Sequence, residues 1–281
     1  MNVVAAFRAE VLKLRKRPGV RILVATMAGV VLLLGYVLLY VFATQTPDDQ
    51  LQGLDSALLL DALRPASLPI QVLGMVVGPG SAIALILGAL AFGAEYSWRT
   101  ITTIATQRPS RLALVTGRIL AVLAACLVLV LAGFAGGVVG TAVVSLLEQA
   151  DGGGPTVADV LSAFGVGALA TAVWAAIGLC LATVLRSMAW AIGLGLLYTF
   201  AIESVVGLLP LRGRVGDLVA RALIGNNVTA LVIDVAPDSA ATLGAPTIAI
   251  DPEQAVGVLV MYVGIALVVA VAVFIRRDIA T

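Results

Sequence analysis

Six stretches of more than 20 predominantly apolar residues run through this 281-residue chain and restrict its fold more than any other feature. A helix needs about 20 such residues to cross the hydrocarbon core of a bilayer, where all its backbone polar groups must be bonded internally. Only 12% of the residues are charged, whereas a soluble domain has about 25%. We therefore predict an all-α integral membrane protein. It is a single transmembrane domain over residues 1–281, with spans at about 22–44, 70–94, 119–147, 160–185, 188–209 and 255–275.

Two interruptions shape these spans. Only Arg186-Ser187 separates the fourth span from the fifth, and one continuous helix would be about 75 Å long at 1.5 Å per residue. The hydrocarbon core is about 30 Å thick, so the chain must turn at Arg186. In the second span, Gly78-Pro79-Gly80 predicts a kink, because Pro79 lacks a backbone donor and clashes with the preceding turn.

The distribution of Lys and Arg predicts the orientation. With the N-terminus in the cytoplasm, the segments on that side hold 13 of the 17 basic residues, and the opposite segments hold 12 of the 16 acidic ones. Basic residues collect in cytoplasmic loops, so both termini are expected in the cytoplasm. The first apolar run, Ile22–Thr44, is too long for the core of a signal peptide and is expected to be the first span.

Several reaction classes are disfavoured. The chain has no histidine, which excludes His-based acid–base catalysis and the common zinc sites. Cys126 and Cys180 lie in apolar runs, as buried hydrophobes do. No phosphate-binding loop is present, so the chain alone cannot hydrolyse ATP and is not expected to be an enzyme. An intramembrane hydrolase is a remote alternative, because facing spans carry no paired aspartates.

The N-terminal residues 3–17 have the pattern of an amphipathic helix. Val3, Phe7, Val11 and Leu14 fall on one stripe, and basic residues that include Arg8, Lys13 and Arg15 occupy the rest. Such a helix would lie in the cytoplasmic interface with its cations toward anionic lipid headgroups. The alternative is a basic tail that only sets the topology.

A polar segment, Glu95–Arg111, separates the second and third spans. Glu95 and Arg99 have the favourable i, i+4 spacing, and Trp98, Ile101 and Ile104 would share one helical face. The β-branched run through Thr102 lowers helix propensity, so a helix here would depend on contacts. The alternative is a loop whose arginines, Arg108 and Arg111 among them, merely fix the topology.

Glu203 is the one ionisable residue well inside a span. An acid in the membrane is by default a functional candidate, either as a proton site or as a lining of a substrate path. The alternative is a carboxylate paired with an arginine or a backbone donor near the outer interface. Beyond it, the long outer segment Pro210–Glu253 contains two apolar stretches, 217–224 and 227–235, that could re-enter the bilayer.

Glycines recur within the spans, as in Gly133-Phe134-Ala135-Gly136-Gly137 and Gly193-Leu194-Gly195. Small residues allow helix backbones to approach closely in lipid. These groups therefore mark either packing faces or the ordinary composition of membrane helices.

Together these features resemble the type-2 ATP-binding-cassette (ABC) transporter permease family. The resemblance rests on the basic helix that begins at Phe7, on Arg99-Thr100-Ile101 and Arg108-Pro109-Ser110-Arg111 after an acidic residue, on the long outer segment, and on Arg276-Arg277-Asp278. It covers essentially the whole chain.

The resemblance implies a permease for a bacterial exporter in the cytoplasmic membrane. A separate ATP-binding subunit, in two copies, would carry ATP and magnesium, and a second permease copy would complete a homodimer; no nucleic acid is involved. The residues expected to couple to the ATPase are Glu95, Trp98, Arg99, Ile101, Thr102, Ile104, Arg108, Arg111 and, at the second turn, Arg186.

Further expectations concern the cargo and the mechanism. Pro210–Glu253 would be a re-entrant outer gate, and Glu203 would lie on a substrate path. The apolar second and fifth spans favour a hydrophobic or amphipathic cargo. The competing hypothesis is a proton-coupled secondary carrier that uses Glu203, although such carriers often contain inverted repeats and the two halves show none.

Overall fold

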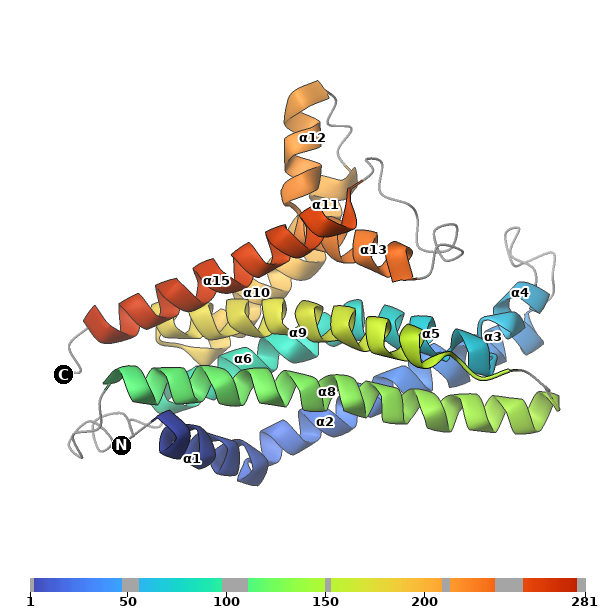
Figure 1. Ribbon diagram of the computed structural model, residues 1–281, viewed down its shortest axis with the longest axis horizontal. Helices are drawn as coiled ribbons and strands as arrows, with labels where there is room; N and C mark the ends of the chain where they lie inside the picture. The colour runs from blue at the N-terminus through green and yellow to red at the C-terminus, as the bar shows by residue number, and fades with distance from the viewer. Residues whose placement is uncertain are drawn as a thin grey trace.

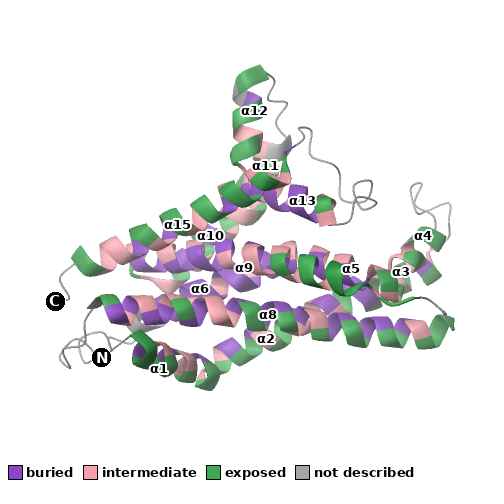
Figure 2. Ribbon diagram, viewed as in Figure 1, coloured by how far each residue is buried: buried purple, intermediate pink, exposed green. Residues whose placement is uncertain are grey.

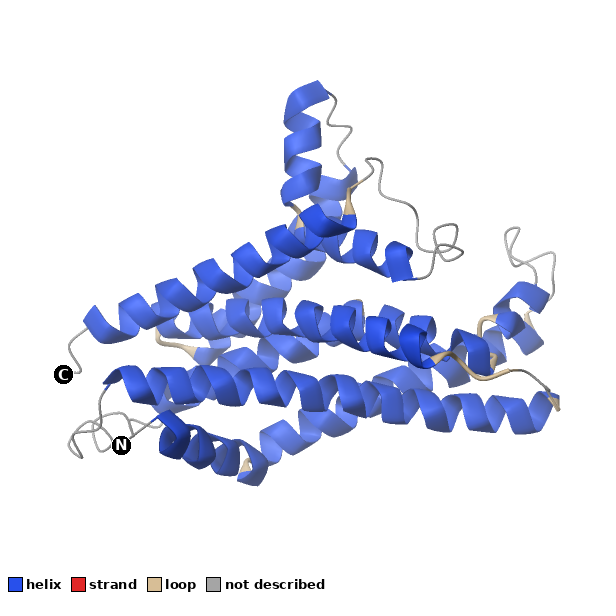
Figure 3. Cartoon of the chain, viewed as in Figure 1, coloured by secondary structure: helices blue, strands red, loops and turns tan. Residues whose placement is uncertain are grey.

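The computed structural model describes residues 3–46, 56–97, 111–149, 153–208, 213–235 and 250–276. All regular elements within these ranges are helices (Figure 3). In chain order the elements are α1 (Val3–Lys16), α2 (Pro18–Val30), the π-helix η1 (Val31–Leu38), α3 (Leu39–Gln45), α4 (Ser56–Asp61), the short 3₁₀ turn η3 (Pro65–Ser67), α5 (Leu68–Val77), α6 (Pro79–Ser97), α8 (Arg111–Glu148), α9 (Val157–Leu185), α10 (Met188–Leu196), the π-helix η4 (Leu197–Ile202), α11 (Glu203–Leu208), α12 (Gly213–Ala222), α13 (Ile224–Val235) and α15 (Pro252–Arg276).

The described helices confirm a multi-pass membrane protein. Four stretches are long and apolar enough to cross a bilayer alone, namely Pro18–Gln45, Leu112–Glu148, Val157–Leu185 and Pro252–Arg276. Two bent helix pairs, α5 with α6 and α12 with α13, raise the number of candidate spans in the described ranges to as many as six. The predicted span 188–209 is helical as α10, η4 and α11, but its apolar helix, Met188–Ile202, is shorter than a typical span. That it crosses the bilayer stays a prediction.

Two long helices begin before the predicted membrane spans that they contain. The first long helix starts at Pro18 rather than Ile22, because Arg17 is extended and a residue before proline avoids the helical region. The third starts at Arg111 rather than Ile119. Hydropathy assigns Arg118 to a loop, whereas this arginine is only 5% exposed and lies inside the helix.

The predicted kink in the second span is confirmed. The helices on either side of Gly78 meet at 52°, as expected where Pro79 interrupts the hydrogen-bond ladder. The Gly78 carbonyl accepts from both the Ser81 hydroxyl at 2.6 Å and the Ser81 N–H at 3.1 Å, and these two bonds fix the start of α6 after the break.

A second irregularity lies in the first span, where η1 is a π-helix. A π-turn displaces carbonyls from the regular i→i+4 ladder. Gln71 of α5 donates its side-chain N–H to the Gly35 carbonyl at 2.6 Å. Tyr36, buried beside it, accepts a 2.8 Å hydrogen bond from the Thr141 hydroxyl of α8. These two bonds tie the irregular turn to α5 and α8.

The helix α9 lies at the centre of the bundle. In its most apolar stretch of 18 residues, 56% of the residues are buried, compared with 17% in the corresponding stretch of α15. Buried residues gather where α6, α8 and α9 face one another, while α15 is mostly half-buried or exposed (Figure 2). Exposed side chains on α15 include Val260, Ile265 and Val268. Lipid or another protein surface must cover such a face.

Helices α6 and α9 cross at backbone contact. A Cβ atom added to Gly88 of α6 would collide with the Ala175 carbonyl of α9, and one added to Gly178 would collide with the Leu85 carbonyl of α6. Only glycine fits at both positions, because the obstacle is backbone that no rotamer change can move.

The chain reverses so that several segments meet at one end of the bundle, here named the N-terminal end. The start of α1, the end of α6, the start of α8, the α9–α10 turn and the end of α15 lie there (Figure 1). Helix α4, the end of α8 and the start of α9 lie at the opposite end, and α12 stands away from the bundle (Figure 1).

Candidate functional site

The N-terminal end contains a buried ionic cluster around Glu10 of α1. Its Oε1 atom accepts from Lys13 Nζ at 2.7 Å and from Arg118 Nη2 of α8 at 3.1 Å. The Glu10 and Arg118 side chains are 8% and 6% exposed, whereas Lys13 is 30% exposed. A carboxylate this buried must be paired, because an isolated ion would lose its hydration without compensation.

Arg118 extends this cluster to α6. Its guanidinium carbon lies 4.5 Å from the centre of the Phe92 ring, within cation–π range. Phe92 in turn meets Phe274 of α15 edge to face, at 6.0 Å between ring centres. Glu10, Lys13, Arg118 and Phe92 form what we term the N-terminal cluster, which joins α1, α8 and α6.

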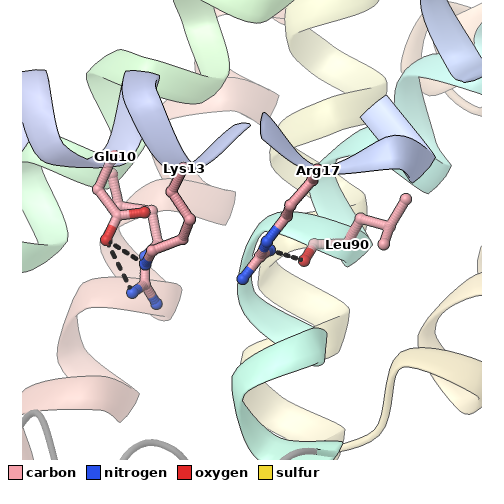
Figure 4. Close-up of polar contacts among 5 residues, drawn as sticks. Glu10, Lys13, Arg17 and Leu90 are labelled. Carbon is pink, nitrogen blue, oxygen red and sulfur yellow. Dashed lines mark hydrogen bonds and ion pairs between the residues drawn. The ribbon is translucent and has the colours of Figure 1, made fainter. Parts of the chain in front are cut away.

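Two further contacts hold α1 against the bundle. Arg17 Nη1 donates to the Leu90 carbonyl of α6 at 3.1 Å (Figure 4). Gly117, beside Arg118, lets α1 approach α8, since an added Cβ atom would lie 2.6 Å from the Ala6 Cβ atom. The N-terminal helix is thus packed against the protein and does not lie on a lipid surface alone.

The predicted apolar stripe of α1 coincides only in part with the face that is buried, which is formed by Ala6, Glu10 and Leu14. Leu14 is buried, and Phe7 and Val11 pack at the edge of the core. Val3 is 37% exposed, so the first residue of the predicted stripe is not packed against the bundle. Arg8 and Arg15 are exposed. Sequence reasoning missed Glu10, although it lies four residues before Leu14 and therefore on the same helical face.

The cluster borders the predicted coupling segment. Trp98, Arg99, Ile101, Thr102, Ile104 and Arg108 lie outside the described residues, and for Glu95 and Arg111 only the helical backbone is described. Phe92 and Arg118 lie on the two helices, α6 and α8, that lead into and out of this segment. The two helices that flank the segment are therefore joined through a buried contact within about two turns of it.

The second predicted cytoplasmic turn is formed by Arg186. It caps α9 in the left-handed conformation at φ 53°, and Ser187 then caps α10 by accepting from the Trp190 N–H. The turn at this position is confirmed. Arg186 is exposed, and the α9–α10 turn lies at the same end of the bundle as the end of α6 and the start of α8 (Figure 1).

Glu203 lies elsewhere, where α11 meets the α12–α13 corner. Its Oε1 atom accepts from the Gly225 N–H at 3.2 Å, one residue into α13. An anion at a helix N-terminus pairs with otherwise unsatisfied backbone donors. Of the interpretations of Glu203 given by the sequence, the pairing of its carboxylate with a backbone donor therefore matches the contact in the structure.

Other bonds fix the same corner. Asn227 donates to the Arg221 and Leu223 carbonyls at 2.8 and 2.7 Å, which closes the end of α12. Tyr262 of α15 donates to the Ala222 carbonyl at 2.9 Å. The two helices meet at 72°, and α13 is the one whose side chains are mainly buried. Of the two stretches predicted to re-enter, α13 packs against the bundle along its length, whereas α12 contacts α15 at its C-terminal end, where Arg221 also donates to Gln254 at 2.8 Å.

Glu203 also lines a cavity of about 250 Å³ beside the α5–α6 kink. Its other described lining residues are uncharged: Val77, Gly78, Ser81, Trp174, Thr199, Phe200, Gly225, Val228 and Thr229. The lining is mostly apolar, and its polar side chains are Glu203 and the hydroxyls of Ser81, Thr199 and Thr229.

The capping role of Glu203 can be tested directly. Glu203→Ala removes the acceptor for the α13 N–H and is expected to destabilise that helix by about 1 kcal/mol. Amide exchange in residues 224–235 should therefore accelerate about fivefold. Glu203→Gln retains a carbonyl acceptor and should exchange more slowly than the alanine variant. Equal exchange in wild type and Glu203→Ala would refute the cap.

Metal sites and redox chemistry find no support in the described residues. No group of three or more potential acidic, cysteine or histidine ligands occurs there. Cys126 is buried and Cys180 half-buried, and both are free thiols, in line with their interpretation as small hydrophobes.

The fold and its inner cluster define a multi-pass helical membrane protein whose N-terminal helix is packed into the bundle. The family described as ABC-2 family transporter protein matches residues 6–202. This is more than half of the chain, so the chain belongs to the ABC-2 transporter family. It is accordingly the membrane permease of an ABC transporter, a class that associates with an ATP-binding subunit. No curated protein matches the chain.

The match runs from α1 through η4 and ends immediately before Glu203. It therefore includes the N-terminal cluster, the segment between α6 and α8, and the Arg186 turn. The α12–α13 corner and α15 lie beyond it.

Proposed function

We propose that this permease belongs to a bacterial exporter and that ATP hydrolysis on a partner subunit drives it through the α6–α8 connection. The observation that carries the proposal is the N-terminal cluster. It locks α1, α6 and α8 together where the connecting segment leaves the bundle. A movement imposed on that segment would reach three helices at once.

The proposed orientation places the N-terminal end in the cytoplasm of a bacterial cell, with the protein in the plasma membrane. The support is the charge bias of the sequence, since basic residues collect in cytoplasmic segments. The α6–α8 connection and the Arg186 turn then face the same compartment as ATP. The working unit would contain two permeases and two ATPases, with ATP and magnesium held by the latter.

The proposed cargo is hydrophobic or amphipathic, such as a drug or lipid-like compound, and α13 would act as a re-entrant outer gate. Support comes from the apolar bundle and from the cavity beside the α5–α6 kink, where Glu203 is the one charged group among the described lining residues. Its contact with α13 joins the cavity to the proposed gate. The same residue would be the proton site in a carrier, and Glu203→Gln would then abolish gradient-driven transport without ATP.

The proposed docking is tested by copurification. Ile101→Asp/Ile104→Asp charges the predicted apolar face and should reduce recovery of the ATP-binding subunit at least tenfold, because a buried unpaired charge costs several kcal/mol at an interface. Leu58→Asp/Val157→Asp is the matched control, since both residues are exposed, lie outside the predicted spans, and belong to α4 and the start of α9, which lie at the opposite end of the bundle (Figure 1). Unchanged recovery in the isoleucine variant would contradict the proposal, provided that both variants remain in the membrane at wild-type amounts.

A further inference from the structure

A large apolar groove opens between the N-terminal helices and α8. Its volume is about 800 Å³, within the range of pockets that hold drug-sized ligands. Helices α1 and α2 form one wall and α8 the other, with a single contribution, Leu87, from α6.

The groove has a polar end and an apolar body. Arg15 and Arg21, both exposed, are the charged residues in its described lining, and they flank the junction of α1 and α2. Arg21 Nε donates to the Arg15 carbonyl at 2.9 Å, which holds the two residues close together. The rest of the described lining is alanine, valine and leucine. The groove therefore has two positively charged side chains at one end and an apolar lining along the rest.

The slot is longer than the hydrocarbon thickness of one membrane leaflet. Along α8 it extends from Ala121 to Ala135, a rise of about 21 Å at 1.5 Å per residue. One leaflet contributes about 15 Å, half of the hydrocarbon core. The groove therefore has room for an extended acyl chain that reaches from the interface to the bilayer midplane.

We propose that this groove binds one anionic phospholipid of the surrounding membrane, with its phosphate between Arg15 and Arg21 and an acyl chain against α8. Arginine recognises phosphate through paired N–H donors, and basic groups at a membrane surface favour anionic headgroups. The bound lipid fills the space between α1–α2 and α8, and it thereby braces the helix that carries Glu10. This site does not depend on the proposed transport function.

The test measures lipid retention by native mass spectrometry of the purified full-length protein, exchanged into either phosphatidylglycerol or phosphatidylcholine with identical acyl chains. Wild type should retain one phosphatidylglycerol after delipidation and lose phosphatidylcholine. Arg15→Gln/Arg21→Gln should weaken phosphatidylglycerol retention about tenfold, because both phosphate contacts are removed. Arg8→Gln/Lys16→Gln removes the same charge from exposed positions of α1 outside the groove and should retain the lipid as wild type does.

A second pair of variants separates the groove from its charge. Ala124→Phe fills the slot and should expel the lipid although both arginines remain, whereas Val143→Phe, on an exposed part of α8 outside the groove, should not. Arg21→Lys retains the positive charge and distinguishes loss of phosphate binding from local unfolding.

Three results would overturn the proposal. They are equal retention of the two lipids by wild type, equal loss in the groove and control variants, and a disulfide between copies formed by Ala25→Cys in membranes. The last would show that a second copy of the chain covers the groove.

Discussion

Gly178→Leu is expected to separate α6 from α9 and to destabilise the protein by about 3 kcal/mol or more, the upper end of the range for overpacking. A Cβ atom at this position falls on the Leu85 carbonyl, and the reciprocal position Gly88 meets the Ala175 carbonyl. Backbone stands on both sides of the crossing, so no side-chain adjustment can relieve the clash.

The chain offers a matched control in the same helix. Gly165 of α9 has no atom within 4 Å of an added Cβ, so Gly165→Leu should change stability by much less. The two variants are compared by thermal unfolding in detergent, with the loss of the monodisperse peak as the readout. A similar melting temperature for both leucine variants would show that the α6–α9 contact is not as close as described.

Glu10→Gln is expected to destabilise the protein by about 3–5 kcal/mol, the usual cost of removing one partner from a buried ion pair. Arg118 would remain buried against Phe92 without its contact to the Glu10 carboxylate. Lys13 is more exposed and can turn to solvent. The double variant Glu10→Leu/Arg118→Met removes both charges and should recover much of the lost stability, because no unpaired ion remains.

A second ion pair provides the control. Arg64 and Asp61 are also 3.1 Å apart, but their side chains are 59% and 62% exposed. Asp61→Asn should therefore cost less than about 1 kcal/mol, as is typical of surface pairs. Equal destabilisation by Glu10→Gln and Asp61→Asn would mean that burial of the cluster contributes nothing.

The long helices and their breaks could be predicted from sequence, because each has a local cause. Hydrocarbon thickness sets the length of the apolar runs, Pro79 bends the second span, and Arg186 ends α9. The glycine pattern was only partly informative. Gly136 meets the Ala28 backbone of α2, as a packing face would, yet Gly193 meets nothing within 4 Å. The crossing at Gly88 and Gly178 does have small residues four apart, Ala84 with Gly88 and Gly178 with Ala182, but this spacing is common in membrane helices and does not by itself identify the pair that meets.

The N-terminal cluster could not be predicted in the same way. Glu10 and Arg118 are separated by 108 residues, and charge counting treats Arg118 as one more loop arginine that sets the topology. Its burial depends on α1 folding back along α8, which in turn depends on the small Gly117 at the contact. Such a pairing requires tertiary structure. The predicted coupling residues 98–108 stay a prediction from sequence.

The central claim, that the α6–α8 connection docks on an ATP-binding subunit, is tested most directly by photo-crosslinking in intact cells. A photoreactive amino acid at position 101 or 104 should form an adduct with a protein that contains a phosphate-binding loop. The same probe at position 157, which is 76% exposed and lies at the opposite end of the bundle (Figure 1), should not. An ATPase adduct from position 157, or none from positions 101 and 104, would contradict this account.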